Sequence, residues 1–317
     1  MEENEKFIIN NKEIKPGESE MVRMFVGKLP SGNRIFINAS IFRSKNPGPR
    51  VLLLAGMHGD EFDGIEILRL FLRDFQSSAL KRGTLIVIPV LNIYGFLNFS
   101  REVPDGKDVN RSFPGVSSGS LASRMANSLT KKILPLTDFI IDFHTAGASN
   151  YNYPQIRYTK SDEKGLELSK VFNAPFTIAK PVISKSLRKT AVNNNIPVLV
   201  YEGGEALRRD EFAIEMGTRG IYRVLDYLDL IDREDDQNYP HIHLRGSSWR
   251  RATQAGFFIP VKKSGDPVKK GEVIGMVQDL HDQKEYEIKS IRDGFVIGNS
   301  YSPVVHQGDA LYHIGYF

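Results

Sequence analysis

The chain has 317 residues, of which 41% are apolar and 25% charged, as in a globular protein of one large domain or two smaller ones. It contains no cysteine, which excludes disulfides, thiolate zinc sites and a cysteine nucleophile, and this is typical of a cytoplasmic protein. The net charge of +4 arises from cations interleaved with anions, so we expect a small anionic substrate and no nucleic acid.

The first fifty residues predict short strands and turns. Their acidic start lacks the pattern of a secretory signal, and no apolar run in the chain approaches the ~20 residues of a membrane span, so no membrane partner is expected. Residues 35–42 alternate apolar and polar side chains, which predicts a half-buried strand before a turn at 46–49. The continuous apolar run 51–55 then predicts a strand buried on both faces.

Three buried strands are predicted to end in polar side chains. The strand at 51–55 is followed by His58 and Glu61, a strand at 139–143 by His144, and a strand at 197–201 by Glu202. The carboxyl ends of parallel strands share one edge of a sheet, which is where ligands bind in open α/β folds. We therefore expect these side chains to converge.

Between these strands the chain predicts helices, one further strand and one long loop. The loop spans residues 90–121 and is rich in aromatic and polar side chains, which favours a functional role. The strand–helix–strand order predicts right-handed βαβ units. The further strand is expected at 84–89, and helices at 62–75, 121–134, 163–173, 189–195 and 209–231.

The predicted fold class is α/β, with a mixed, mostly parallel central sheet flanked by helices and a small C-terminal all-β domain. A charged linker at 232–238 separates an α/β domain of residues 1–237 from short β-like segments at 238–317 with regular glycines.

The convergent side chains favour a zinc site. Two histidines and one glutamate are a known ligand set for catalytic zinc, so His58, Glu61 and His144 are the predicted ligands of one ion per chain. Asp60 and Asp63 are rival carboxylates near His58. Hydrolysis at such a site needs a separate carboxylate to move the proton of the attacking water. Three further carboxylates have candidate roles: Glu202 as that proton carrier, Glu205 as its alternative, and Asp142 as a partner that orients a histidine.

Asn110 and Arg111, on the long loop, favour binding of a carboxylate. The guanidinium of arginine forms a planar fork that matches a carboxylate, and asparagine adds a second donor. The alternative is a structural arginine paired with Asp105 or Asp108.

Four motifs together resemble the succinylglutamate desuccinylase/aspartoacylase family, within the wider zinc carboxypeptidase-like fold. They are Gly-Met-His-Gly-Asp-Glu (56–61), Asp-Val-Asn-Arg-Ser-Phe-Pro-Gly (108–115), Asp-Phe-His-Thr-Ala (142–146) and Tyr-Glu-Gly-Gly-Glu (201–205). The resemblance implies the zinc ligands given above, Glu202 as general acid/base, and Asn110 with Arg111 on the substrate carboxylate. It further implies that Arg101 polarises the scissile carbonyl and that Arg188 lies on the substrate side.

The C-terminal segment resembles the barrel-sandwich of biotinyl and lipoyl domains. Lys284 lies in a hairpin without the Met-Lys-Met pattern, so we expect it to be unmodified. Tyr286 and Tyr301 are candidates for reaching the active site from this domain. The pair His241 and His243 is interpreted as part of a strand at the domain junction rather than as a metal site.

The sequence therefore predicts a zinc-dependent amidohydrolase that removes the acyl group from a small, anionic N-acyl amino acid or a related carboxylate. The alternatives are a metallocarboxypeptidase acting on short peptides and a metal-binding protein that has lost catalysis. The acyl group, the amino acid and the formation of a homo-oligomer are left open.

Overall fold

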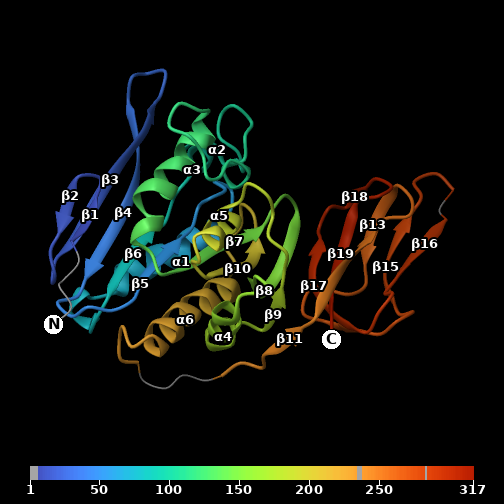
Figure 1. Ribbon diagram of the computed structural model, residues 1–317. Coiled ribbons are helices and arrows are strands. Elements are labelled where there is room, and N and C mark those ends of the chain that lie inside the picture. Colours follow the sequence, from blue (N-terminus) through green and yellow to red (C-terminus); the bar gives the residue numbers. More distant parts are fainter. Residues whose placement is uncertain (1–5, 234–237, 283) are drawn as a thin grey trace.

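The computed structural model describes residues 6–233, 238–282 and 284–317 (Figure 1). Most of the predicted linker, residues 234–237, thus lies outside the described residues. One sheet of 13 strands runs through the molecule, with the order β12-β19-β17-β8-β10-β7-β5-β6-β4-β3 along its main path. Its strands are β3 (Ser19–Lys28), β4 (Arg34–Arg43), β5 (Arg50–Leu54), β6 (Thr84–Ile88), β7 (Phe139–Ala146), β8 (Asn150–Tyr158), β9 (Phe176–Ala179), β10 (Val198–Glu205), β11 (Ile242–Leu244), β12 (Gly246–Arg251), β14 (Pro267–Val268), β17 (Gly294–Ser300) and β19 (Ala310–Tyr316).

Four neighbouring strands form a parallel centre in this sheet. Strands β6, β5, β7 and β10 are neighbours and pair in parallel, whereas β4 beside β6 and β8 beside β10 pair antiparallel. The sheet is therefore mixed, as predicted, but it is not mostly parallel: outside this centre, only β8 with β9 and β9 with β11 pair in parallel among the described strands. The carboxyl ends of these four strands meet at one edge.

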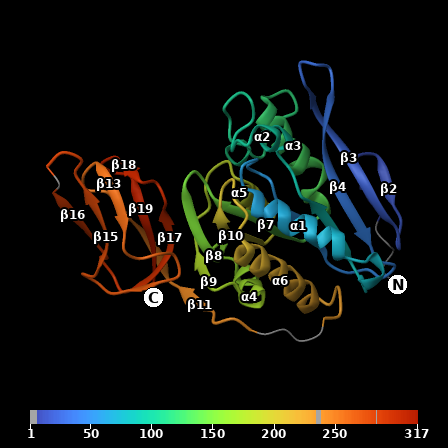
Figure 2. The ribbon, with the colours of Figure 1, turned by 180° about the vertical axis from the view of Figure 1, so that it is seen from behind.

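Helices cover both faces of the parallel centre (Figures 1 and 2). The side chains of β5 alternate between two cores: Leu52 and Leu54 pack toward α3 and α5, and Val51 and Leu53 toward α1, α4 and α6. This explains the unbroken apolar run, because a strand covered on both faces has no solvent-facing position. The helices are α1 (Phe62–Asp74), α2 (Ile93–Asn98), α3 (Leu121–Lys132), α4 (Glu163–Phe172), α5 (Leu187–Asn193) and α6 (Glu211–Tyr227), with short 3₁₀ turns η1 (Ser77–Ala79), η2 (Val109–Arg111) and η3 (Leu134–Leu136).

Most of the predicted elements are present, with three differences. The loop predicted at 90–121 contains α2 and η2, so it is less irregular than expected. Strands β7 and β10 extend further than predicted and include His144 and Glu202, which therefore lie inside the strands rather than after them. Strands β8 and β9 were not predicted, because β8 carries Pro154 and several polar side chains instead of an apolar run.

The described residues after position 238 form strands and no helix. A second sheet has the order β16-β15-β13-β18, built from β13 (Gly256–Pro260), β15 (Val273–Gln278), β16 (Glu285–Lys289) and β18 (Val304–Val305). It shares a small core with β14, β17 and β19. Because β17 pairs with β8 and β11 pairs with β9, the C-terminal strands extend the large sheet instead of forming a detached unit. A separate hairpin of β1 (Phe7–Ile9) and β2 (Lys12–Ile14) lies at the N-terminal end.

None of the helices in the described part of the chain is both long enough and apolar enough to cross a membrane.

Candidate active site

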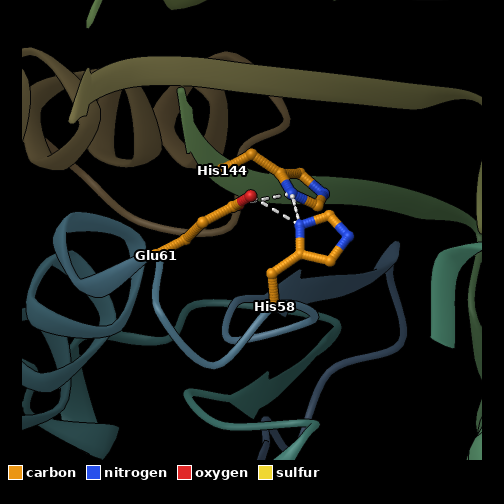
Figure 3. A group of neighbouring side chains, drawn as sticks. All are labelled: His58, Glu61 and His144. Carbon is orange, nitrogen blue, oxygen red and sulfur yellow. Dashed lines mark hydrogen bonds and ion pairs between the residues drawn. The ribbon is translucent and has the colours of Figure 1, made fainter. Parts of the chain in front are cut away.

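His58, Glu61 and His144 meet at the carboxyl edge of the parallel strands, as predicted (Figure 3). The Nδ1 atom of His58 lies 2.6 Å from Glu61 Oε1, and the Nδ1 atom of His144 lies 2.8 Å from Glu61 Oε2. The two Nδ1 atoms are 3.3 Å apart. All three side chains are buried, and one ligand atom from each lies within 4.8 Å of the others.

Close backbone packing places this group. His58 lies in the turn between β5 and α1, and Glu61 is the residue before the first turn of α1. At Gly59 in this turn, a Cβ atom would lie 1.8 Å from the backbone of Gly95 in α2, so only glycine fits. His144 is placed by the pairing of β7 with β5, which sets Asp142 opposite Leu54.

The electrostatics of the group fit a cation. Burial acts to raise the pKa of Glu61, but the two histidines outweigh burial and hold that pKa below its ordinary value. Burial acts to lower the pKa of His58 and His144, yet the surrounding carboxylates raise both. Two imidazole nitrogens and a carboxylate that face one small space are the donor set of a catalytic zinc site, so the residues present fit the ion.

Carboxylates contact the outer side of both histidines. Asp142 Oδ2 lies 3.0 Å from His144 Nε2, so the predicted orienting contact is present. Asp108 Oδ1 lies 3.3 Å from His58 Nε2, a role the sequence did not predict. Such contacts select the tautomer that leaves Nδ1 free to bind a metal. The rival Asp63 points elsewhere and accepts the backbone N–H of Asp210 at 3.0 Å, and Asp60 is not part of the metal-binding group.

Glu202 lies beside this group on β10. It pairs in register with His144 on β7, and both side chains line the same pocket. Each carboxylate oxygen accepts one hydrogen bond, Oε1 from Arg157 Nη1 at 2.7 Å and Oε2 from Asn152 Nδ2 at 2.9 Å. The alternative base, Glu205, does not line the pocket and instead lies 3.4 Å from Arg208.

A bulge after Glu202 separates these two glutamates. The register of β10 against both neighbouring strands shifts between Glu202 and Gly204 or Glu205. Gly204 has a φ of +86°, and a Cβ atom there would lie 2.0 Å from Asp63 Oδ2. The glycine therefore permits a backbone kink that leaves Glu202 facing the pocket.

The predicted substrate residues all line the pocket, but in different ways. Arg101 donates from Nη2 to Asp108 at 2.9 Å, and its Nη1 lies 3.3 Å from Glu61, next to the metal-binding group. The ion pair of Arg111 with Asp108, the alternative, is present but long at 3.9 Å, and Arg111 Nη1 also donates to the carbonyl oxygen of Asn110 at 2.8 Å. Asn110 accepts the backbone N–H of Leu187 through Oδ1 at 3.0 Å, which leaves its amide N–H₂ group to donate.

Arg188 has a buried guanidinium with an unmet donor. Its Nη2 donates to the carbonyl oxygen of Pro181 at 2.6 Å, whereas its buried Nη1 has no partner among the described residues. Burial, together with the nearby Arg157 cation, lowers the pKa of Arg188 to about 10. An orphaned cationic donor at a pocket wall indicates a site for an anion.

The pocket has a volume of about 310 Å³. It is lined by residues from the parallel centre, from β8, from nearby loops and from β12 at one end of the large sheet: His58, Glu61, Arg101, Asn110, Arg111, Asp142, His144, Thr145, Ala146, Gly147, Asn150, Asn152, Arg157, Ile183, Ser186, Arg188, Val200, Glu202 and Trp249. A larger cavity of about 740 Å³ lies beside Arg50 and Asp138, at the start of β5, and lacks the metal-binding group.

Ten of the pocket residues were not predicted from the sequence, and Asn152, Arg157 and Trp249 are the most informative of these. Asn152 and Arg157 lie on β8, whose alternating polar side chains were the only signal available. Trp249 reaches the pocket from the C-terminal strands, in place of the two tyrosines considered. Neither Tyr286 nor Tyr301 belongs to the described pocket lining, and Tyr301 lies beside another cavity, with Tyr151 and Asp210.

The histidine pair and Lys284 lie in the C-terminal part. His243 lies on β11, which pairs with β9, so the interpretation of a junction strand is confirmed. His241 contacts the carbonyl oxygen of Ala174 at 2.8 Å. Lys284 is exposed and pairs with Asp282 at 2.6 Å in its hairpin.

The fold and the pocket together define a class of protein: an α/β protein with a candidate metal centre, an adjacent carboxylate and several arginines at the edge of a parallel sheet. The catalytic-domain sequence model of the succinylglutamate desuccinylase/aspartoacylase family matches residues 47–228. The chain belongs to the succinylglutamate desuccinylase/aspartoacylase family.

Individual relatives agree with this assignment. The chain is 28% identical to an N-alpha-acetyl-L-2,4-diaminobutyric acid deacetylase from Halomonas elongata, covering 90% of this chain and 88% of that protein. A succinylglutamate desuccinylase/aspartoacylase from Rhodobacter sphaeroides is similar in structure, with a TM-score of 0.84, 26% identity and coverage of 94% and 95%. The product-bound ectoine utilization protein EutE (DoeB) from Ruegeria pomeroyi shares the fold, with a TM-score of 0.85, 21% identity and coverage of 94% and 95%.

Proposed function

We propose that the chain is a zinc-dependent hydrolase that removes the acyl group from an N-acyl amino acid or a related small carboxylate. The observation that carries this proposal is the convergence of His58, Glu61 and His144 with Glu202 in one pocket. Family membership and the deacetylase activity named for the Halomonas relative support it. We further propose a cytoplasmic location and residues 1–237 as the catalytic domain.

His58, Glu61 and His144 would hold one zinc ion per chain through two Nδ1 atoms and a carboxylate. When bound, zinc acts as a Lewis acid that polarises a carbonyl oxygen and increases the acidity of water. Asp142 and Asp108 orient the two imidazole rings for this task.

Glu202 moves the proton. Its carboxylate accepts a proton from the water that attacks the amide carbon, and it then delivers this proton to the nitrogen of the leaving amine. Arg157 and Asn152 each hold one oxygen of the carboxylate, so the orientation of Glu202 does not depend on substrate. Each oxygen keeps lone-pair capacity for the transferred proton.

Three side chains would hold the substrate's negative charge. Arg111 and the amide N–H₂ group of its neighbour Asn110 both line the pocket. Arg188 adds Nη1, which has no partner among the described residues. Arg101, beside Glu61, would stabilise the negative charge that develops on the scissile carbonyl oxygen. The excess of arginines in the pocket fits an anionic substrate.

Turnover of a substrate panel tests the proposal. The zinc-loaded protein should hydrolyse one or more N-acetyl, N-succinyl or N-formyl amino acids, and Glu202→Gln should reduce kcat by about 10²–10⁴-fold while zinc content is unchanged. Glu205→Gln is the matched control and should retain activity. Cleavage of dipeptides with no activity on N-acyl amino acids would instead establish a metallocarboxypeptidase.

A further inference from the structure

The only tryptophan of the chain, Trp249, lines the same pocket as the metal-binding group although it lies on C-terminal strand β12. Its indole ring stacks on the imidazole of His313, with ring centroids 4.4 Å apart and planes 5° apart. The side chain is nevertheless 40% exposed. One face of the ring is therefore covered by protein, and the rest is available to a molecule in the pocket.

A row of register partners connects Trp249 to the bulge in β10. Across successive strands the pairs are Gly204 with Asn152, Asn152 with Gly298, Gly298 with His313, and His313 with Trp249. Neighbouring strands are about 4.8 Å apart, so β12 lies roughly 14 Å from β8 along this row. Trp249 thus faces the end of the pocket that is far from the metal-binding group.

A second exposed apolar side chain lines the pocket. Ile183 is 49% exposed, and its carbonyl oxygen accepts a hydrogen bond from Ser186 Oγ at 2.7 Å. The segment that carries Ile183 is joined to β12 because Lys180 Nζ donates to Ser247 Oγ and lies 3.2 Å from His313 Nε2. The ring of Trp249 and the backbone that carries Ile183 are therefore held in place by contacts that need no substrate.

The charges around these side chains disfavour a cationic group on the substrate. Arg157, Arg188 and Lys180 lie near one another, and burial followed by the nearby Arg157 lowers the pKa of Lys180 to about 8. Among the described residues, neither Lys180 nor Arg188 forms an ion pair with a carboxylate. A substrate ammonium group would meet this excess of positive charge, whereas an alkyl chain would not.

We propose that Trp249 and Ile183 form an apolar subsite for the end of the substrate farthest from the scissile amide. The substrate would thus be an N-acyl amino acid with an apolar distal chain, supplied either by the acyl group or by the amino-acid side chain. This inference rests on the proposed deacylase function and adds the chemical class of its substrate.

Two series of substrates test whether the apolar chain of the substrate belongs to its amino-acid side chain or to its acyl group. One series compares N-acetylnorvaline with Nα-acetyl-2,4-diaminobutyrate and N-acetylglutamate, which carry apolar, cationic and anionic side chains of similar length. The other compares N-acetylalanine with N-hexanoylalanine. In at least one of the two series, the substrate with the longer or more apolar chain should have a kcat/KM about tenfold or more above that of the other substrates in the series.

Substitution assigns this preference to the subsite. Trp249→Ala and Ile183→Ala should each reduce the preference severalfold, whereas Trp249→Phe should keep most of it. Phe257→Ala is the matched control, because Phe257 is 43% exposed on the same C-terminal part and does not line the described pocket. Equal kcat/KM values across both series, or a preference for the ammonium substrate, would overturn the inference.

The fluorescence of Trp249 distinguishes failure of the subsite proposal from failure of the deacylase proposal. If no N-acyl amino acid is hydrolysed, the deacylase proposal is wrong, but N-acetylnorvaline and N-hexanoylalanine can still be titrated into the zinc-loaded protein. Because Trp249 is the only tryptophan, a saturable change in its fluorescence would support the subsite. No change with either compound up to millimolar concentration would reject it.

Discussion

The two sides of the pocket differ in how far the protein satisfies its own polar groups. On the metal side, His58, Glu61 and His144 are buried and in mutual contact. On the substrate side, one nitrogen of Arg188 has no partner among the residues that the structure describes, and Trp249 is 40% exposed. A side that is complete except for a cation is preorganised for chemistry, whereas a side with unmet donors and exposed apolar surface is prepared for a ligand.

Glu202 belongs to the preorganised side although it stands next to the substrate. Its two oxygens are held by Arg157 and Asn152, both from β8, the strand that joins the parallel centre to the C-terminal strands. The same strand therefore orients the proton carrier and supports the wall that carries Trp249. Substitutions on the metal side should change metal content or kcat, and those on the substrate side should mainly change KM.

The largest expected effect is on the metal side. His58→Ala removes one of three proposed ligands, so we expect loss of bound zinc and of activity, measured by metal analysis and turnover. Asp142→Asn leaves all three proposed zinc ligands in place but changes the contact that orients His144. It should therefore weaken zinc binding by about 10–100-fold. Full zinc occupancy in His58→Ala would contradict the ligand assignment.

The next effect concerns the orientation of Glu202. Arg157→Met should lower kcat by about 10–100-fold, with a smaller change in KM, because one carboxylate oxygen loses its charge-assisted hydrogen bond. Arg157→Lys should restore part of kcat, and zinc content should stay unchanged in both variants. If KM rose while kcat stayed constant, Arg157 would belong to the substrate side instead.

A smaller and different effect is expected at Arg111. Arg111→Lys keeps the charge but loses the planar fork, so KM should rise by about tenfold with little change in kcat. Steady-state kinetics with the best substrate of the panel measure both parameters. Arg82→Lys, which changes an exposed arginine outside the pocket, provides the control and should leave KM unchanged. An equal loss in kcat would place Arg111 in the chemical step.

The smallest expected effect is a pH dependence of stability from Lys180, which joins the segment that carries Ile183 to β12. Burial lowers its pKa to about 8 in the folded chain, from an ordinary value near 10.5. Between these pH values the unfolded chain binds more protons, so this group makes the protein more stable as the pH rises from about 8 to about 10.5. Relative to Lys180→Met, the wild-type Tm should therefore rise over this window; a constant difference would show that burial does not shift the pKa.

Much of the metal side could be predicted from the sequence. Apolar runs buried on both faces predict β5, β7 and β10. The polar residues that follow these runs are His58, His144 and Glu202. Strands of one parallel sheet end at the same edge, so these residues had to come close together. The order of the predicted strands and helices also indicated a mixed α/β fold with C-terminal strands.

The residues that hold Glu202, and the C-terminal wall of the pocket, could not be predicted in this way. Arg157 and Asn152 lie on a strand whose polar side chains and proline hide its secondary structure, and their contacts with Glu202 depend on the pairing of β8 with β10. Trp249 reaches the pocket only because β12, β19 and β17 continue the sheet from β8. Local periodicity determines which strands form and which face is buried, whereas strand order and register, which bring distant residues together, are decided by tertiary packing.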